Sequence, residues 1–100
     1  MRWLLAVILV CGCATSLSKG AMRIRDADES DVSRCEFVGR VSGSSSWGGT
    51  NACGTGERNA MNEAREQAAE LGATHVVWRS VNCDMSGTHA DGEAFECSRD

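Results

Sequence analysis

Six cysteines in a chain of 100 residues constrain the possible fold more than any other feature of the sequence. Such a density is unusual for a reducing cytosol, where cysteine pairs are commonly metal sites or redox catalysts. Two lie near the N-terminus, and the others are Cys35, Cys53, Cys83 and Cys97. The span 35–97 has 63 residues, fewer than the roughly 70–80 at which a single hydrophobic core suffices. We therefore expect disulfides to stabilise one small domain.

Apolar patterning predicts three strands in this domain. Residues 35–42 alternate, with Cys35, Phe37, Gly39 and Val41 on one face and Val38 as the exception. An apolar centre at residues 76–78 predicts a second strand over residues 74–82, in a central position in the sheet. A short third strand is expected over residues 93–97, after a flexible polar segment from 84 to 92.

A helix is predicted between the first two strands, from about Glu57 or Asn59 to Leu71. Gly72 suits the left-handed residue that ends a helix. The apolar stripe recurs at i, i+3, i+7 and i+10, and its members are Met61, Ala64, Ala68 and Leu71. The fold class is therefore α+β: a small β-α-β-β domain with an Ala-rich helix on a three-stranded sheet, stapled by disulfides.

The four cysteines can pair in three ways. The alternation of side chains along the strands, here called strand parity, indicates which pairing is favoured. Cys35 and Cys97 each share a strand face with an aromatic residue two positions away, so both can lie on a core-facing side near the end of the sheet. This favours Cys35–Cys97 and, by elimination, Cys53–Cys83. The alternative is Cys83–Cys97 across the last hairpin, together with Cys35–Cys53.

The glycine-rich stretch 43–56 resembles a phosphate-binding loop only in composition. It has no lysine, and Gly54-Thr55-Gly56-Glu57-Arg58-Asn59 lacks the third glycine of a dinucleotide motif. We expect a flexible connection here. Whether Trp47 covers the core or is exposed is left open by the sequence.

Catalytic and metal-binding patterns are weak in this chain. There is no Cys-x-x-Cys, so zinc would require His75 and His89 to meet Cys83 and Cys97 through the fold. We expect His75 to be packed or at an edge and His89 to be solvated. The C-terminal carboxylates Asp84, Asp91, Glu93 and Glu96 lack EF-hand spacing and indicate a solvated acidic face. The expectation is a non-enzymatic protein without a cofactor or metal.

The N-terminus has the features of an export signal. Met1-Arg2 is followed by an apolar run of eight residues, Trp3 to Val10, which is too short to span a bilayer and fits a signal-peptide core. Val10-Cys11-Gly12-Cys13 resembles the bacterial lipobox. That resemblance implies diacylglycerol transfer to Cys13 and cleavage after Gly12. The alternatives are an ordinary cleaved signal and a short apolar cytosolic terminus.

The expected organisation is a signal peptide over 1–12, the lipidated Cys13 with a polar tether over 13–34, and the domain over 35–98. A short strand is expected around Met22 to Arg25. Removal of residues 1–12 takes Arg2 and changes the formal charge from -4 to -5. This charge gives nucleic acid no general basic surface to bind.

The order of these features resembles a family of small Gram-negative lipoproteins of unknown function and, more distantly, RcsF-like envelope-stress sensors. The segments that carry the resemblance are the lipobox, Cys35-Glu36-Phe37-Val38-Gly39-Arg40-Val41-Ser42-Gly43, the Ala-rich helix, Leu71-Gly72-Ala73-Thr74-His75-Val76-Val77 and Cys97. In the lipoprotein family, a cysteine beside the first strand pairs with one near the C-terminus. RcsF-like sensors have a longer linker with proline, and this chain has none.

These resemblances imply a lipoprotein that faces the periplasm and contacts other envelope proteins. Ala14, in place of the aspartate that retains many lipoproteins at the inner membrane, implies the outer membrane. The alternatives are an RcsF-like stress sensor that acts through protein partners, and a small periplasmic metal-binding or thiol-redox protein.

Overall fold

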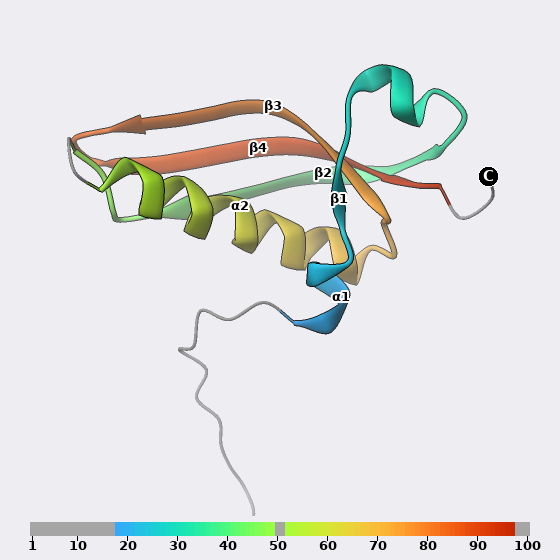
Figure 1. The fold of residues 1–100 in the computed structure, drawn as a ribbon, viewed down its shortest axis with the longest axis horizontal. Helices are drawn as coiled ribbons and strands as arrows, with labels where there is room; N and C mark the ends of the chain where they lie inside the picture. Colours follow the sequence, from blue (N-terminus) through green and yellow to red (C-terminus); the bar gives the residue numbers. More distant parts are fainter. Residues whose placement is uncertain (1–17, 50–51, 98–100) are drawn as a thin grey trace, which may run out of the picture.

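One long helix packs against one face of a four-stranded sheet with the strand order β1-β3-β4-β2 (Figure 1). The computed structural model describes residues 18–49 and 52–97. In chain order, the elements are α1 (Lys19–Met22), β1 (Arg25–Asp26), the 3-10 helix η1 (Glu29–Val32), β2 (Glu36–Ser45), α2 (Cys53–Glu70), β3 (His75–Asp84) and β4 (Gly87–Glu96). The predicted α+β class is confirmed, with four strands instead of three.

Strand β4 has a partner on both sides, antiparallel to β2 and to β3. Strand β1 adds to the outer edge of β3 in parallel, but only opposite His75 and Val76. Only Met85 and Ser86 separate β3 from β4, so the flexible segment expected over 84–92 is wrong. Gly87 allows the tight return because it has a positive φ of 139° and its Cα lies close to the Ser45 carbonyl.

A bulge at Val38 changes which face of β2 is covered. Phe37 pairs with Phe95, and Gly39 pairs with Ala94, so Val38 is an extra residue in the ladder. Beyond the bulge Val41 is buried under α2, whereas Phe37 is 52% exposed. The predicted common face for Phe37 and Val41 is therefore wrong, because the extra residue shifts the alternation by one position.

The core between α2 and the sheet consists mostly of small side chains. Ala60, Ala64 and Ala68 are fully buried along the inner side of the helix, and Val76 is fully buried beneath it. The predicted stripe is correct at Ala64 and Ala68. It is wrong at Leu71, which is 45% exposed, because the buried row continues toward the start of the helix.

The helix begins at Cys53, earlier than predicted, and β2 extends to Ser45. The glycine-rich stretch is therefore divided between a strand, a helix and a short connection. Gly56 lies in the helix where a Cβ would collide with Thr88 and the Trp47 carbonyl. This close packing explains a glycine in the first turns of a helix, where its conformational entropy is unfavourable. Trp47 itself is 56% exposed.

Side chains of α2 cap the free edge of β2. The backbone N–H of Ser42 donates to Gln67 Oε1 at 3.0 Å, and that of Ser44 donates to Glu63 Oε1 at 2.8 Å. These bonds occupy donors that would otherwise be available to another strand. The same bonds hold the helix in register along β2.

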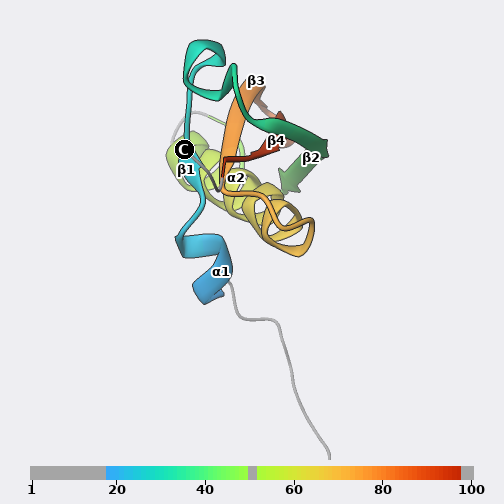
Figure 2. The same cartoon turned by 90° about the vertical axis from the view of Figure 1, so that its right-hand side faces the viewer.

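Residues 18–34 differ from the expected polar tether, because they fold onto the domain. The buried side chains of this segment are few: Ala21, Ile24 and Val32. Strand β1 carries the chain past the edge of the sheet, from α1 on one side to η1 on the other (Figures 1 and 2). The segment contains few large apolar residues, which is why its sequence predicts a polar tether.

Candidate functional site

The expected lipidation residue, Cys13, lies outside the described residues, which begin at Ser18. Ser18 Oγ accepts a hydrogen bond from Ala21 N at 3.1 Å and thereby caps α1. The Ser18 backbone N–H donates to Glu66 Oε2 at 2.7 Å, which ties the start of α1 to α2. Five residue steps separate Cys13 from Ser18, a reach of at most about 18 Å.

The segment that follows Ser18 is fixed to both layers of the domain. Ile24 belongs to the same buried cluster as Ala68 and Val76. Arg25 N donates to the Thr74 carbonyl at 3.0 Å, and Ala27 N donates to the Val76 carbonyl at 2.9 Å. The N-terminal segment is thus an integral part of the sheet and core.

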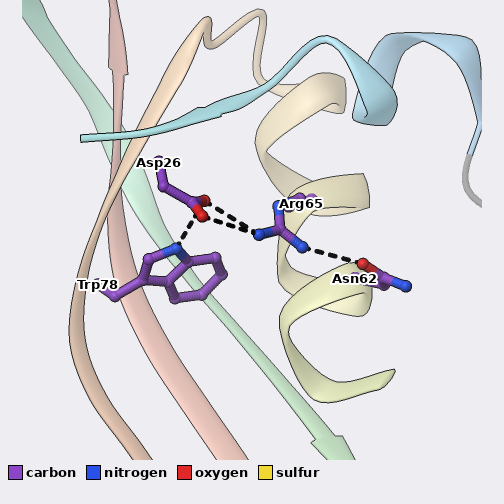
Figure 3. Close-up of polar contacts among 4 residues, drawn as sticks. All are labelled: Asp26, Asn62, Arg65 and Trp78. Carbon is purple, nitrogen blue, oxygen red and sulfur yellow. Dashed lines mark hydrogen bonds and ion pairs between the residues drawn. The ribbon is translucent and has the colours of Figure 1, made fainter. Parts of the chain in front are cut away.

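A polar network joins β1, α2 and β3 at this point (Figure 3). Arg65 Nη2 donates to Asp26 Oδ1 at 3.0 Å and lies 3.2 Å from Oδ2. The Trp78 indole N–H donates to Asp26 Oδ1 at 2.9 Å, and Arg65 Nη1 donates to Asn62 Oδ1 at 2.9 Å. The Arg65 guanidinium carbon lies 5.5 Å from the centroid of the Trp78 ring, within cation–π range. We call these four residues the Asp26 network.

The Asp26 network has a structural role, because it holds β1, α2 and β3 together. The Arg65 side chain is only 17% exposed, and the Asp26 carboxylate supplies its counter-charge. The same carboxylate accepts the indole N–H of Trp78, which is partly buried against the core. Sequence reasoning missed the network because its members lie far apart in the chain and form no local motif.

Replacing Asp26 with alanine is expected to destabilise the chain by about 1–2 kcal/mol, because two donors lose their acceptor at once. The half-exposed carboxylate keeps the effect at the low end for a charged network. Urea denaturation measures this loss, and Asp91→Ala is the matched control. Asp91 is exposed, and the described residues offer its side chain no ion pair. Equal stability of the two variants would contradict a stabilising role for the Asp26 network.

The structure joins Cys35 to Cys97 and Cys53 to Cys83. This is the connectivity that strand parity favoured. The predicted core-facing side is wrong, however, because Phe37 pairs with Phe95 on the face of the sheet away from α2. The first bridge closes the ladder just beyond the Glu36–Glu96 pair. The second links the first residue of α2 to β3.

The disulfides remove the thiolates that the zinc alternative needed, because Cys83 and Cys97 are both bridged. His75 Nδ1 lies 2.7 Å from Thr74 Oγ1, and His89 is exposed on β4. Over residues 18–49 and 52–97, no group of three or more potential ligand side chains is placed to hold a metal ion.

The C-terminal carboxylates do not form one cluster. Asp84 closes the β3–β4 turn by accepting bonds from Ser86 Oγ at 2.7 Å and Ser86 N at 2.9 Å. The Ser86 hydroxyl and backbone N–H lower the pKa of Asp84. Glu93 instead accepts from Arg79 Nη2 at 2.6 Å, on the face of the sheet away from α2. Asp84 and Glu93 therefore have separate structural roles.

Arg79 also pairs with Glu29 Oε2 at 2.6 Å, which holds η1 against the sheet. The hydrogen bonds that Arg79 donates to Glu93 and then to Glu29 raise the pKa of Arg79. Beside it lies a shallow depression of about 360 Å³, lined by Arg40, Val41, Ser42, Arg79, Asp91, Gly92 and Glu93. The depression is open and is lined by side chains of both charges.

In the part of the chain that the structure describes, no helix has the length and apolar character needed to cross a bilayer. Comparisons with protein-family models, with curated proteins and with solved structures found no match to this chain.

Proposed function

We propose that this chain is a periplasmic lipoprotein anchored in the outer membrane through acylated Cys13, with a non-enzymatic structural or protein-interaction role. The observation that carries the proposal is the lipobox-like Val10-Cys11-Gly12-Cys13 directly before a disulfide-stapled domain. Several acyl chains, each contributing about 0.8 kcal/mol per buried CH₂, make such an anchor stable. Ala14 supports transfer to the outer membrane.

The two disulfides support an oxidising compartment. Such bridges form and persist outside the reducing cytosol, and both join segments that are distant in sequence, 62 and 30 residues apart. Bridges of this kind act as structural staples, which favours an interaction domain over a thiol-redox protein. Partners of the domain are expected among other envelope proteins.

An RcsF-like stress sensor is the second candidate, supported by the order of lipobox, two bridges and a small domain. The folded residues 18–34 bear on how such a sensor would work. An extended tether from Cys13 to Cys35 would reach about 75 Å, whereas the chain up to Ser18 reaches about 18 Å. The short reach favours partners in or near the membrane that holds the anchor.

Radiolabelled palmitate tests the proposal. We expect label in the wild-type chain and in Cys11→Ser, because only the cysteine after the cleavage site is acylated. We expect none in Cys13→Ser. Label that persists in Cys13→Ser, or a wild-type chain without label, would overturn the lipoprotein proposal. Separation of the two membranes on a density gradient then distinguishes the outer from the inner membrane.

A further inference from the structure

We infer that the outward side of α1 is the surface on which the domain rests against the bilayer. This inference rests on the proposed acylation of Cys13. The occupant is the anionic glycerophospholipid headgroup layer of the leaflet that holds the anchor. Because at most about 18 Å of chain separates Cys13 from Ser18, α1 is the described element that is held closest to the anchor.

The outward side of α1 combines one apolar side chain with two cations. Ala21 faces the domain and is fully buried, whereas Lys19, Met22 and Arg23 are exposed at positions i, i+3 and i+4. We call these three residues the α1 surface. Met22 is 67% exposed. An exposed apolar side chain between long cationic ones suits the headgroup region, where the aliphatic stems are buried and the charges meet phosphates.

Charge is distributed along the chain in a way that favours this orientation. Residues 18–25 carry Lys19, Arg23 and Arg25 and no carboxylate, a formal charge of +3. Residues 26–100 carry six arginines and fourteen carboxylates, a formal charge of -8. Glu66 lies beside α1, where it accepts the Ser18 N–H. An anionic bilayer therefore attracts the first segment and repels the rest of the chain.

The opposite end of the domain provides a matched reference position. Met85 is 84% exposed in the β3–β4 turn, whereas α1 packs beside the C-terminal part of α2 (Figure 1). The ten residues of β3 separate the β1 contact from this turn, a distance of roughly 30 Å. Two exposed methionines thus mark the two ends of the domain.

The test places a tryptophan at each end of the full acylated chain. M22W and M85W are reconstituted in vesicles of phosphatidylcholine with about one third phosphatidylglycerol and brominated acyl chains. Trp47 and Trp78 give both variants the same background. We expect several-fold stronger quenching in M22W than in M85W. Adding K19Q and R23Q to M22W should reduce the quenching, whereas adding R40Q, an exposed arginine on β2, should not.

Flotation of the vesicles separates the possible failures. If the chain does not float with the vesicles, this result overturns both the proposed acylation and the inference that rests on it. Chain that floats but shows equal quenching in M22W and M85W overturns the orientation alone. Quenching of M22W that persists in pure phosphatidylcholine or after K19Q/R23Q would overturn the role of the anionic headgroups.

Discussion

A chain in which Cys35 and Cys97 are both replaced with alanine is expected to lose most of its stability. The bridge joins two residues that are 62 positions apart, a loop closure that corresponds to about 4 kcal/mol in the chain-entropy model. A domain of this size has a free energy of unfolding of roughly 4–12 kcal/mol. We therefore expect the melting temperature to fall by roughly 15–30 °C, or the cooperative transition to disappear.

The position of this bridge gives a second reason to expect a large loss of stability. Glu36 and Glu96 face each other as the last pair of the β2–β4 ladder, and like charges directly opposite each other destabilise a sheet. Cys35 and Cys97 lie one residue outside that pair, with their Cα atoms 4.6 Å apart. Without the bridge, we expect this end of the ladder to fray first.

Tryptophan fluorescence and circular dichroism during heating measure the effect on stability. The Cys53→Ala/Cys83→Ala variant is the control for loop length, because its bridge spans 30 residues and corresponds to a somewhat smaller loss. Reductant should unfold the wild-type chain. If the Cys35/Cys97 variant or the reduced wild type melts at the wild-type temperature, the bridges are not needed for stability.

The parts of the fold that the sequence predicted correctly depend on local patterns. The alanines of α2 recur with the period of a helix, and Ala64 and Ala68 are buried as that period requires. Cysteine pairing followed from the period of a strand, because Cys35 and Cys97 both flank the paired Phe37 and Phe95. The alternation of side chains places Cys35 and Cys97 on the same face of the sheet, whichever face the helix covers.

The parts of the fold that the sequence did not predict depend on contacts with tertiary partners. Residues 87–92, Gly-Thr-His-Ala-Asp-Gly, have low strand propensity, yet they form β4 because strands on both sides pair with them. A Cβ at Gly92 would lie 2.9 Å from Val76 Cγ1 and 3.0 Å from the Val77 carbonyl. Small residues here reflect the close approach of neighbours, which a single sequence does not reveal.

The Asp26 network shows the same limit for the candidate site. Asp26 and Arg65 are 39 residues apart in sequence, and Trp78 is 52 residues from Asp26. Their meeting depends on β1 pairing with β3, an element of two residues in a segment that looked like a tether. The short strand expected around Met22 to Arg25 overlaps β1 only at Arg25, because two residues are too few to show the alternation that defines the bounds of a strand.

Gly43→Ala is expected to cost about 3 kcal/mol or more, because α2 lies directly against the backbone of β2 at this position. A Cβ at Gly43 would collide with the Ala60 carbonyl oxygen and lie 3.0 Å from Ala64 N. These are backbone atoms, so no rotamer change relieves the overlap. The helix must move outward, which also disturbs the bonds from Ser42 and Ser44 to its side chains.

Gly54→Ala is the matched control, because it adds the same methyl group in the first turn of α2, where nothing lies within 4 Å. Alanine favours a helix over glycine by up to about 1 kcal/mol, so this variant should be as stable as the wild type or more stable. Urea denaturation of both variants gives the difference in the free energy of unfolding. Equal stabilities would mean that α2 does not require a glycine beneath it, and that the row of buried alanines does not reflect close helix–sheet packing.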